Sequence, residues 1–186
     1  MTKQKPDYTV VEVPLKELSP LVMECLSQGQ EIVLTVTGNS MSPFLRHQRD
    51  QVVLTPCDPT TLQPGMVPFY RRENGQYVMH RIVARDDGEK AVRFGRKAVY
   101  PSAGDGLQYT MMGDAQSYTE PGIRPEQVVA LATAFIRMGK RVECDSPAYR
   151  RHRLLWHRLL PLRKKMMWLD RRLWWRYRRL FPYKAR

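Results

Sequence analysis

Cysteine is scarce in this 186-residue chain, and its three copies show no recognisable spacing. Cys25, Cys57 and Cys144 are an odd number and form neither a paired redox motif nor a set of metal ligands. This favours reduced bystander thiols in a cytosolic compartment over a disulfide framework. We expect no metal and no other cofactor.

Long hydrophobic runs are also missing. No segment approaches the roughly 20 apolar residues of a membrane-spanning helix. The first 20 residues include basic side chains but lack the continuous apolar core of a secretory signal. We therefore expect neither export nor a spanning anchor, and a cytoplasmic location.

Acidic residues almost disappear near the C-terminus. Residues 150–186 hold 14 of the 31 Lys and Arg but only one acid, Asp170. The charges of residues 1–149 therefore sum to zero, and the whole net charge of +13 lies in this tail. All four tryptophans lie there too. This shift in composition predicts a neutral body over 1–147 and a basic, Trp- and Arg-rich helical tail over 148–186.

The body begins with a helix signal and continues with strand signals. Ser19-Pro20 is a typical helix start and Gly29 a typical helix end. Seven β-rich runs follow, separated by Gly, Pro, Asp and Asn: 32–36, 51–54, 66–70, 77–84, 91–94, 109–112 and 128–136. Segments 71–75 and 85–89 read as hairpin loops. The predicted fold is mainly β, a bent antiparallel sheet or partial barrel with a short N-terminal helix.

The tail reads as two helices split by Pro161. One interpretation packs its leucines, such as Leu154 and Leu155, against the body. An equally favoured one is a peripheral helix on an anionic membrane surface, because tryptophan and arginine on amphipathic helices suit the lipid headgroup region. Nucleic acid is a less favoured partner, since no base-reading motif accompanies the basic residues.

Ser40 is the first candidate for chemistry. A strand at 32–36 leads into Thr37-Gly38-Asn39-Ser40-Met41-Ser42-Pro43, where the glycine permits a tight turn and the proline stops regular pairing. Taken alone, this segment is more simply explained as a polar Asn-Ser turn. A serine becomes a nucleophile only with a base and an oxyanion stabiliser nearby.

Two later segments offer partners for that serine. Alternation along the run 77–83 places His80 on the apolar face with Val78 and Ile82, and Arg81 on the other face. Burial there would keep the imidazole neutral, although a core histidine is the commoner explanation. Asp114, at the end of the 109–112 run, could orient the ring.

Together these segments resemble the superfamily of serine peptidases that holds the signal peptidases and the self-cleaving SOS-type and phage repressors. The similar pattern is Gly38-x-Ser40-Met41-x-Pro43, then 52–54, 62–69, His80-Arg81-Ile82-Val83 and Gly113-Asp114. The family has Gly-Asp where this chain has Gly65-Met66.

The resemblance implies roles for single residues. It makes Ser40 the nucleophile, His80 the general base and Asp114 the acid that orients His80, with Glu120 six residues further on as the alternative acid. The Ser40 N–H, and Ser42, would stabilise the oxyanion, and Met41 would shape the pocket. Lys90 and Lys97, as lysine bases, are discounted because both follow the histidine run.

The function expected on this basis is a serine endopeptidase that cleaves a leader or precursor peptide at the cytoplasmic membrane surface. A second hypothesis is a self-processing, repressor-like regulator. Residues 1–39 contain no alanine and no room for a helix-turn-helix domain, which counts against it. A third is a non-enzymatic binding module that uses the basic tail to bind nucleic acid.

Overall fold

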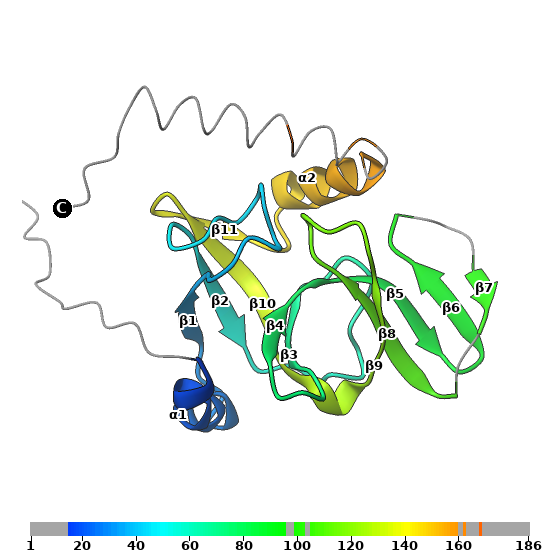
Figure 1. The fold of residues 1–186 in the computed structure, drawn as a ribbon, viewed down its shortest axis with the longest axis horizontal. Helices are drawn as coiled ribbons and strands as arrows, with labels where there is room; N and C mark the ends of the chain where they lie inside the picture. Colours follow the sequence, from blue (N-terminus) through cyan, green and yellow to red (C-terminus); the bar gives the residue numbers. More distant parts are fainter. Residues whose placement is uncertain (1–14, 96–98, 103–104, 160–161, 163–167, 169–186) are drawn as a thin grey trace, which may run out of the picture.

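Two antiparallel sheets make up most of the fold, in a computed structural model that describes residues 15–95, 99–102, 105–159, 162 and 168 (Figure 1). The prediction of a mainly β, antiparallel protein with a curled sheet is confirmed. The first sheet has the order β1-β2-β10-β3-β4, with β11 paired to β10, and its strands are β1 (Ile32–Thr35), β2 (Gln51–Thr55), β3 (Pro68–Arg71), β4 (Tyr77–Met79), β10 (Val128–Arg137) and β11 (Lys140–Glu143). The second has the order β7-β6-β5-β8-β9, with β5 (Arg81–Asp87), β6 (Lys90–Arg93), β7 (Val99–Pro101), β8 (Leu107–Met112) and β9 (Glu120–Ile123).

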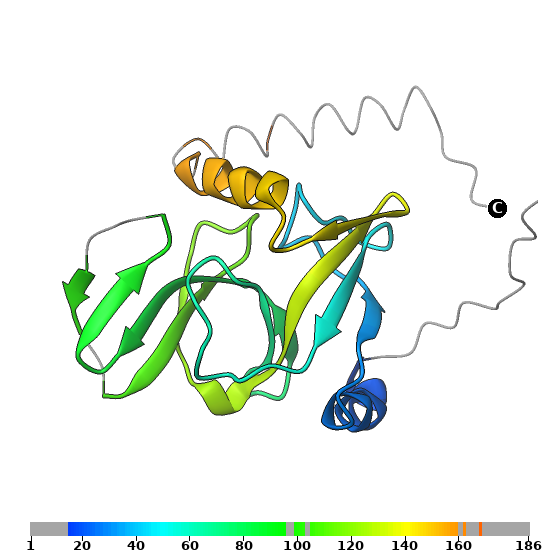
Figure 2. The ribbon, with the colours of Figure 1, turned by 180° about the vertical axis from the view of Figure 1, so that it is seen from behind.

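β10 gives the first sheet its curl. It pairs with β2, β3 and β11 and is irregular between Val128 and Ala130 and between Ala132 and Ala134. Extra residues of this kind bend a strand and increase its twist. Figure 2 shows the sheet curving round to meet β5 and β8 of the second sheet.

The run predicted as one strand over 77–84 is two strands, and that prediction was wrong. β4 belongs to the first sheet and β5 to the second, with His80 between them. Residues on both sides have strand-like side chains, so local alternation continues across the junction although the pairing partner changes. His80, Arg81 and Ile82 are all buried, so the predicted two faces do not hold here.

Other strand predictions were close. The hairpin over 71–75 is confirmed by the pairing of β3 with β4 and by Gly75 at φ 83°. The second turn is also present, with Gly88 at φ 90°, but β5 extends to Asp87 and shortens the loop. The sequence reading missed β7, β9 and β11, which are short and lack a clear apolar alternation.

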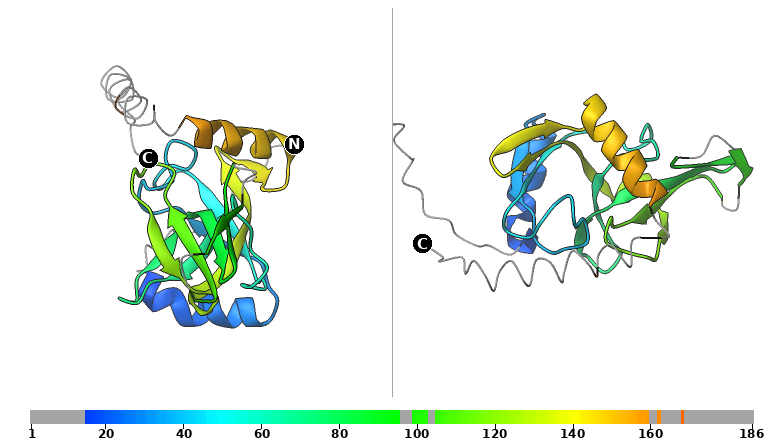
Figure 3. Two further views of the ribbon diagram at one scale, coloured as in Figure 1. Left: turned by 90° about the vertical axis from the view of Figure 1, so that its right-hand side faces the viewer. Right: turned by 90° about the horizontal axis from the view of Figure 1, so that it is seen from above.

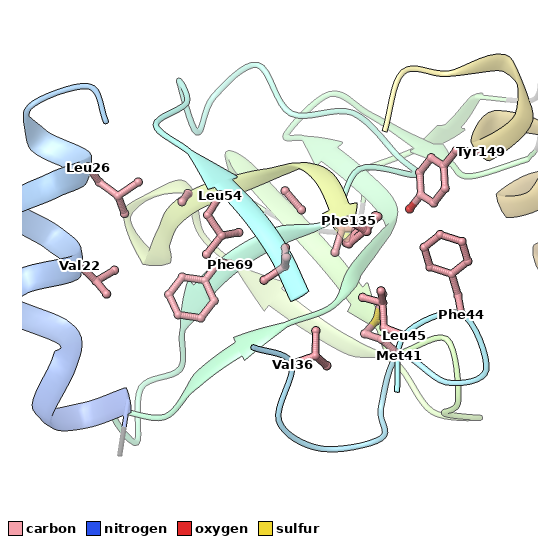
Figure 4. Packing of buried hydrophobic residues seen from close by; sticks show 14 residues of the cluster. Val22, Leu26, Val36, Met41, Phe44, Leu45, Leu54, Phe69, Phe135 and Tyr149 are labelled. Atoms are coloured by element: carbon pink, nitrogen blue, oxygen red, sulfur yellow. The ribbon is translucent and has the colours of Figure 1, made fainter. Parts of the chain in front are cut away.

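Helix α1 (Leu15–Ser27) begins earlier than Ser19, so the predicted start was wrong. Pro20 lies inside the helix, where it removes one N–H donor without ending it. The predicted end is confirmed, since Gly29 has φ 77° and the Gln30 N–H donates to the Cys25 carbonyl. Val22 and Leu26 pack on Leu54 and Phe69, at one end of the main core (Figure 4).

Helix α2 (Pro147–Arg158) crosses the boundary predicted at 147/148 and packs on the body (Figure 3). Ser146 caps it, accepting a hydrogen bond from the Tyr149 N–H. The inward residues are Tyr149 and Trp156, two turns apart, whereas Leu154 and Leu155 are exposed. The interpretation that packs the tail on the body holds for this helix, but Leu154 and Leu155 do not make the contact. The break expected at Pro161 and the second tail helix lie outside the described residues.

Within the described part of the chain, no helix combines the length and the apolar character needed to cross a bilayer.

Candidate active site

Ser40 lies half-buried in the loop between β1 and β2. Gly38 has φ 89°, a conformation open mainly to glycine, and its N–H donates to His47 Nδ1 at 3.0 Å. The loop is closed at its base, where the Val36 N–H donates to the Asp50 carbonyl at 2.9 Å. The turn expected from the sequence is therefore built by backbone geometry and holds Ser40 in a defined place.

The segment Gly113-Asp114-Ala115 lies directly against the Ser40 backbone. The Ala115 N–H donates to the Ser40 carbonyl at 2.7 Å. A Cβ on Gly113 would lie 2.7 Å from that same carbonyl oxygen, closer than a side chain can approach. Glycine is needed here because the two loops touch through their backbones, which brings together two segments of the family-like pattern.

The Asp114 carboxylate pairs with Arg81. Arg81 Nε and Nη2 donate to its two oxygens at 2.9 and 2.6 Å, and both residues are buried. Burial alone would lower the pKa of Arg81, but the charge of Asp114 raises it above its ordinary value. Arg81 Nη1 also donates to the Gly65 carbonyl and the Tyr149 hydroxyl.

The acid beside His80 is Glu120. Its Oε2 atom lies 3.7 Å from His80 Nδ1, and the Tyr70 hydroxyl lies between them, 2.8 Å from Oε2 and 3.2 Å from Nδ1. Of the two acids that the sequence left open, Asp114 is thus bound to Arg81, while Glu120 and Tyr70 contact the imidazole.

This hydrogen-bond chain sets the tautomer of His80. Burial, and then the bond to Glu120, raises the pKa of Tyr70, so the hydroxyl keeps its proton. That proton goes to the carboxylate of Glu120, which can only accept. The Tyr70 oxygen must then accept from Nδ1–H of His80, which leaves the lone pair on Nε2.

His80 is neutral at neutral pH. Burial is the main cause that lowers its pKa, to about 4, and the positive charge of Arg72 lowers it further. Glu120 and Asp114 act in the opposite direction without overcoming burial. Among the described residues we find no hydrogen bond to Nε2, so this nitrogen is able to take a proton.

Glu120 is itself fixed in place. Arg72 Nε and Nη2 donate to its two oxygens, each at 2.7 Å. The hydrogen bond from Arg72 is the main cause that lowers the pKa of Glu120, so the group is a carboxylate at neutral pH. A negative charge therefore stays beside the ring, where it would stabilise an imidazolium.

The remaining predicted site residues have other surroundings. Met41 is buried in the main core with Phe44 and Leu45 (Figure 4). The Ser42 hydroxyl donates to the Leu45 carbonyl at 3.3 Å. Of the two discounted lysines, Lys90 begins β6 with an exposed side chain, and Lys97 lies outside the described residues.

Helix α2 supplies contacts that the sequence reading missed. Trp156 Nε1 donates to the Asp114 carbonyl at 3.0 Å, and Arg153 Nη1 donates to the Gly65 carbonyl at 3.1 Å. Trp156 therefore holds the segment that touches Ser40 directly, and Tyr149 does so through Arg81, whose Nη1 donates to its hydroxyl. No local signal marks these contacts in the sequence.

Tyr70 and Arg72 were also missed, although a signal was present. The signal is their spacing: they are two residues apart at the end of a strand, so their side chains lie on the same side of the chain. Both side chains can therefore reach Glu120.

No group of three or more His, Cys, Asp or Glu side chains in the described ranges could hold a metal ion. Comparison of the chain with models of known protein families and with curated proteins gave no match.

Proposed function

We propose that this protein is a serine endopeptidase of the signal-peptidase and SOS-repressor kind, with Ser40 as nucleophile and His80 as general base. The observation that carries the proposal is the neutral, buried imidazole whose Nδ1 is held by Tyr70 and Glu120 and whose Nε2 is left to accept. Any buried imidazole needs a hydrogen-bond partner, but a base needs in addition a nearby negative charge and a free lone pair, and His80 has both.

Proximity of the serine loop supports the same proposal. Ser40 is bonded to Ala115, the neighbouring Asp114 is bonded to Arg81, and Arg81 follows His80 in the chain. The two reactive residues thus belong to one connected cluster of loops. Order and spacing of the sequence pattern point to the same pair.

The proposed reaction is hydrolysis of a peptide bond in two steps. His80 Nε2 takes the Ser40 proton as Oγ attacks the scissile carbonyl, and it then gives that proton to the leaving amine. Water hydrolyses the acyl-enzyme with the same base. Glu120 stabilises the imidazolium that forms, and Tyr70 keeps Nδ1 protonated throughout.

The oxyanion requires donors near Ser40. The Ser40 backbone N–H is our candidate, because it lies next to the reacting Oγ. Ser42 is less suited, since its hydroxyl donates to the Leu45 carbonyl. Asp114 has a supporting role, pairing with Arg81 and keeping the 113–115 segment against Ser40. The substrate class is a peptide or protein.

A serine-directed phosphonate probe tests the proposal, with the adduct located by mass spectrometry. We expect labelling at Ser40, none in Ser40→Ala, and labelling at least about 100-fold slower in His80→Ala, because a positioned base contributes roughly that much. Ser42→Ala is the matched control, two residues away, and should be labelled like the wild type. Equal labelling of the wild type and Ser40→Ala would contradict the proposal.

A further inference from the structure

We infer that the solvent face of helix α2 is a docking surface for an anionic lipid bilayer. The face consists of Arg151, Leu154, Leu155 and Arg158, which lie three, four and seven residues apart and so form one stripe of the helix. All four are exposed. We refer to them below as the α2 stripe.

The α2 stripe differs from an ordinary solvated face. Leu154 and Leu155 remain 40% and 59% exposed, although both are large apolar side chains on the solvent side of the helix. The inner face is occupied by Tyr149 and Trp156 instead, so the leucines have no place in the core. Single exposed leucines are common, but a pair flanked by an arginine on each side is the pattern of an interfacial helix.

Charge decides which partner fits the surface. Helix α2 has four arginines, adding Arg150 and Arg153 to the two of the stripe, and no acidic residue. The chain carries its entire excess of 13 positive charges from residue 150 onward. Such a segment suits a surface that is uniformly negative. RNA or DNA would attract the arginines but give the two leucines nothing to bury against.

The placement of the helix gives the docking a consequence. Its inner face bonds to Asp114, Gly65 and Arg81, so the bilayer would lie on the outer side of a helix whose inner side bonds to the segment beside Ser40. Figures 1 and 3 show α2 along one side of the molecule and α1 at the opposite side. The inference does not depend on catalysis, because lipid binding is measured without turnover.

Vesicle co-sedimentation of the full chain tests the inference, with phosphatidylcholine vesicles against vesicles of equal parts phosphatidylcholine and phosphatidylglycerol. The wild type should prefer the anionic vesicles. Arg151→Gln/Arg158→Gln should bind them about 25-fold more weakly, since each basic residue near such a surface is worth about fivefold. High salt should remove this difference.

The leucines separate lipid from other anionic partners. Leu154→Gln/Leu155→Gln should weaken vesicle binding by about tenfold or more, because docking would bury the roughly half of each leucine side chain that is now exposed. This loss should persist in high salt, since it does not depend on charge. Leu21→Gln/Met23→Gln, a matched control with exposures of 58% and 46% on α1, should bind like the wild type.

Two results would overturn the inference. One is wild-type affinity of the leucine variant for the anionic vesicles. The other is the absence of binding to either kind of vesicle while the wild type and the leucine variant bind single-stranded RNA equally well. That result would assign the surface to nucleic acid. Circular dichroism should show all three variants folded, since every substituted side chain is exposed.

Discussion

Replacement of each acid by its amide, Glu120→Gln and Asp114→Asn, should separate a carboxylate that serves catalysis from one that serves stability. Glu120 Oε2 lies 3.7 Å from His80 Nδ1, and two unit charges at that distance attract by about 4 kcal/mol at an effective dielectric constant of about 20. Arg72, bonded to the same carboxylate, repels the imidazolium in both proteins and so cancels, but the Glu120 side chain is 23% exposed and solvent screening removes about half of the attraction. The remaining roughly 2 kcal/mol of imidazolium stabilisation corresponds to a rate about 30-fold lower in Glu120→Gln.

The amide also disturbs the tautomer. A Gln side chain can donate to the Tyr70 oxygen, which then donates its own proton to His80 Nδ1 and places the ring hydrogen on Nε2. This would increase the loss beyond the electrostatic value. Because Glu120 raises the pKa of His80, the variant should also hold that pKa lower than the wild type does. Stability should change little, since the Glu120–Arg72 pair is partly exposed to solvent.

Asp114→Asn should behave in the opposite way. It leaves the buried guanidinium of Arg81 without its charged partner, which typically costs about 3–5 kcal/mol of folding free energy. Probe labelling of Ser40 against pH and urea denaturation measure the two effects. If Asp114→Asn unfolds like the wild type while losing labelling, and Glu120→Gln labels normally, the assignment of the two acids made here is refuted.

Three further perturbations follow from the structure. The pKa of His80 is lowered from its ordinary value of 6.5 to about 4. Between these two pH values the unfolded chain binds a proton on this histidine that the folded chain excludes. The free energy of unfolding should therefore fall by about 3 kcal/mol as the pH drops through this range. His80→Asn should flatten that fall in denaturation curves. Gly113→Ala would push a Cβ against the Ser40 carbonyl and should abolish Ser40 labelling in a protein that still folds; unchanged labelling would contradict the loop contact. Tyr149→Phe removes a buried hydroxyl from Arg81 and should lower the urea-derived free energy by about 1.5–3 kcal/mol, whereas the exposed Tyr118→Phe should stay within about 0.5 kcal/mol.

The amino-acid sequence by itself determined most of the strands and turns. β-Branched runs, the glycines at Gly75 and Gly88 and the helix-ending Gly29 act over a few residues, so their signals are local. The charge division was equally plain, because it depends only on composition. The pattern around Ser40 and His80 named the candidate pair before any geometry.

Only the tertiary structure decided how the site is connected. The bonds of Arg81 to Asp114 and of Tyr70 to Glu120 join residues 33 and 50 positions apart, and no local pattern reports such a distance. Alternation could not show the change of sheet at His80, because strand periodicity is the same on both sides while the pairing partner differs. The sequence also did not show which face of α2 is buried. Leucines and aromatic residues are both apolar, and only the shape of the body, which accepts Tyr149 and Trp156, determines which of them is buried.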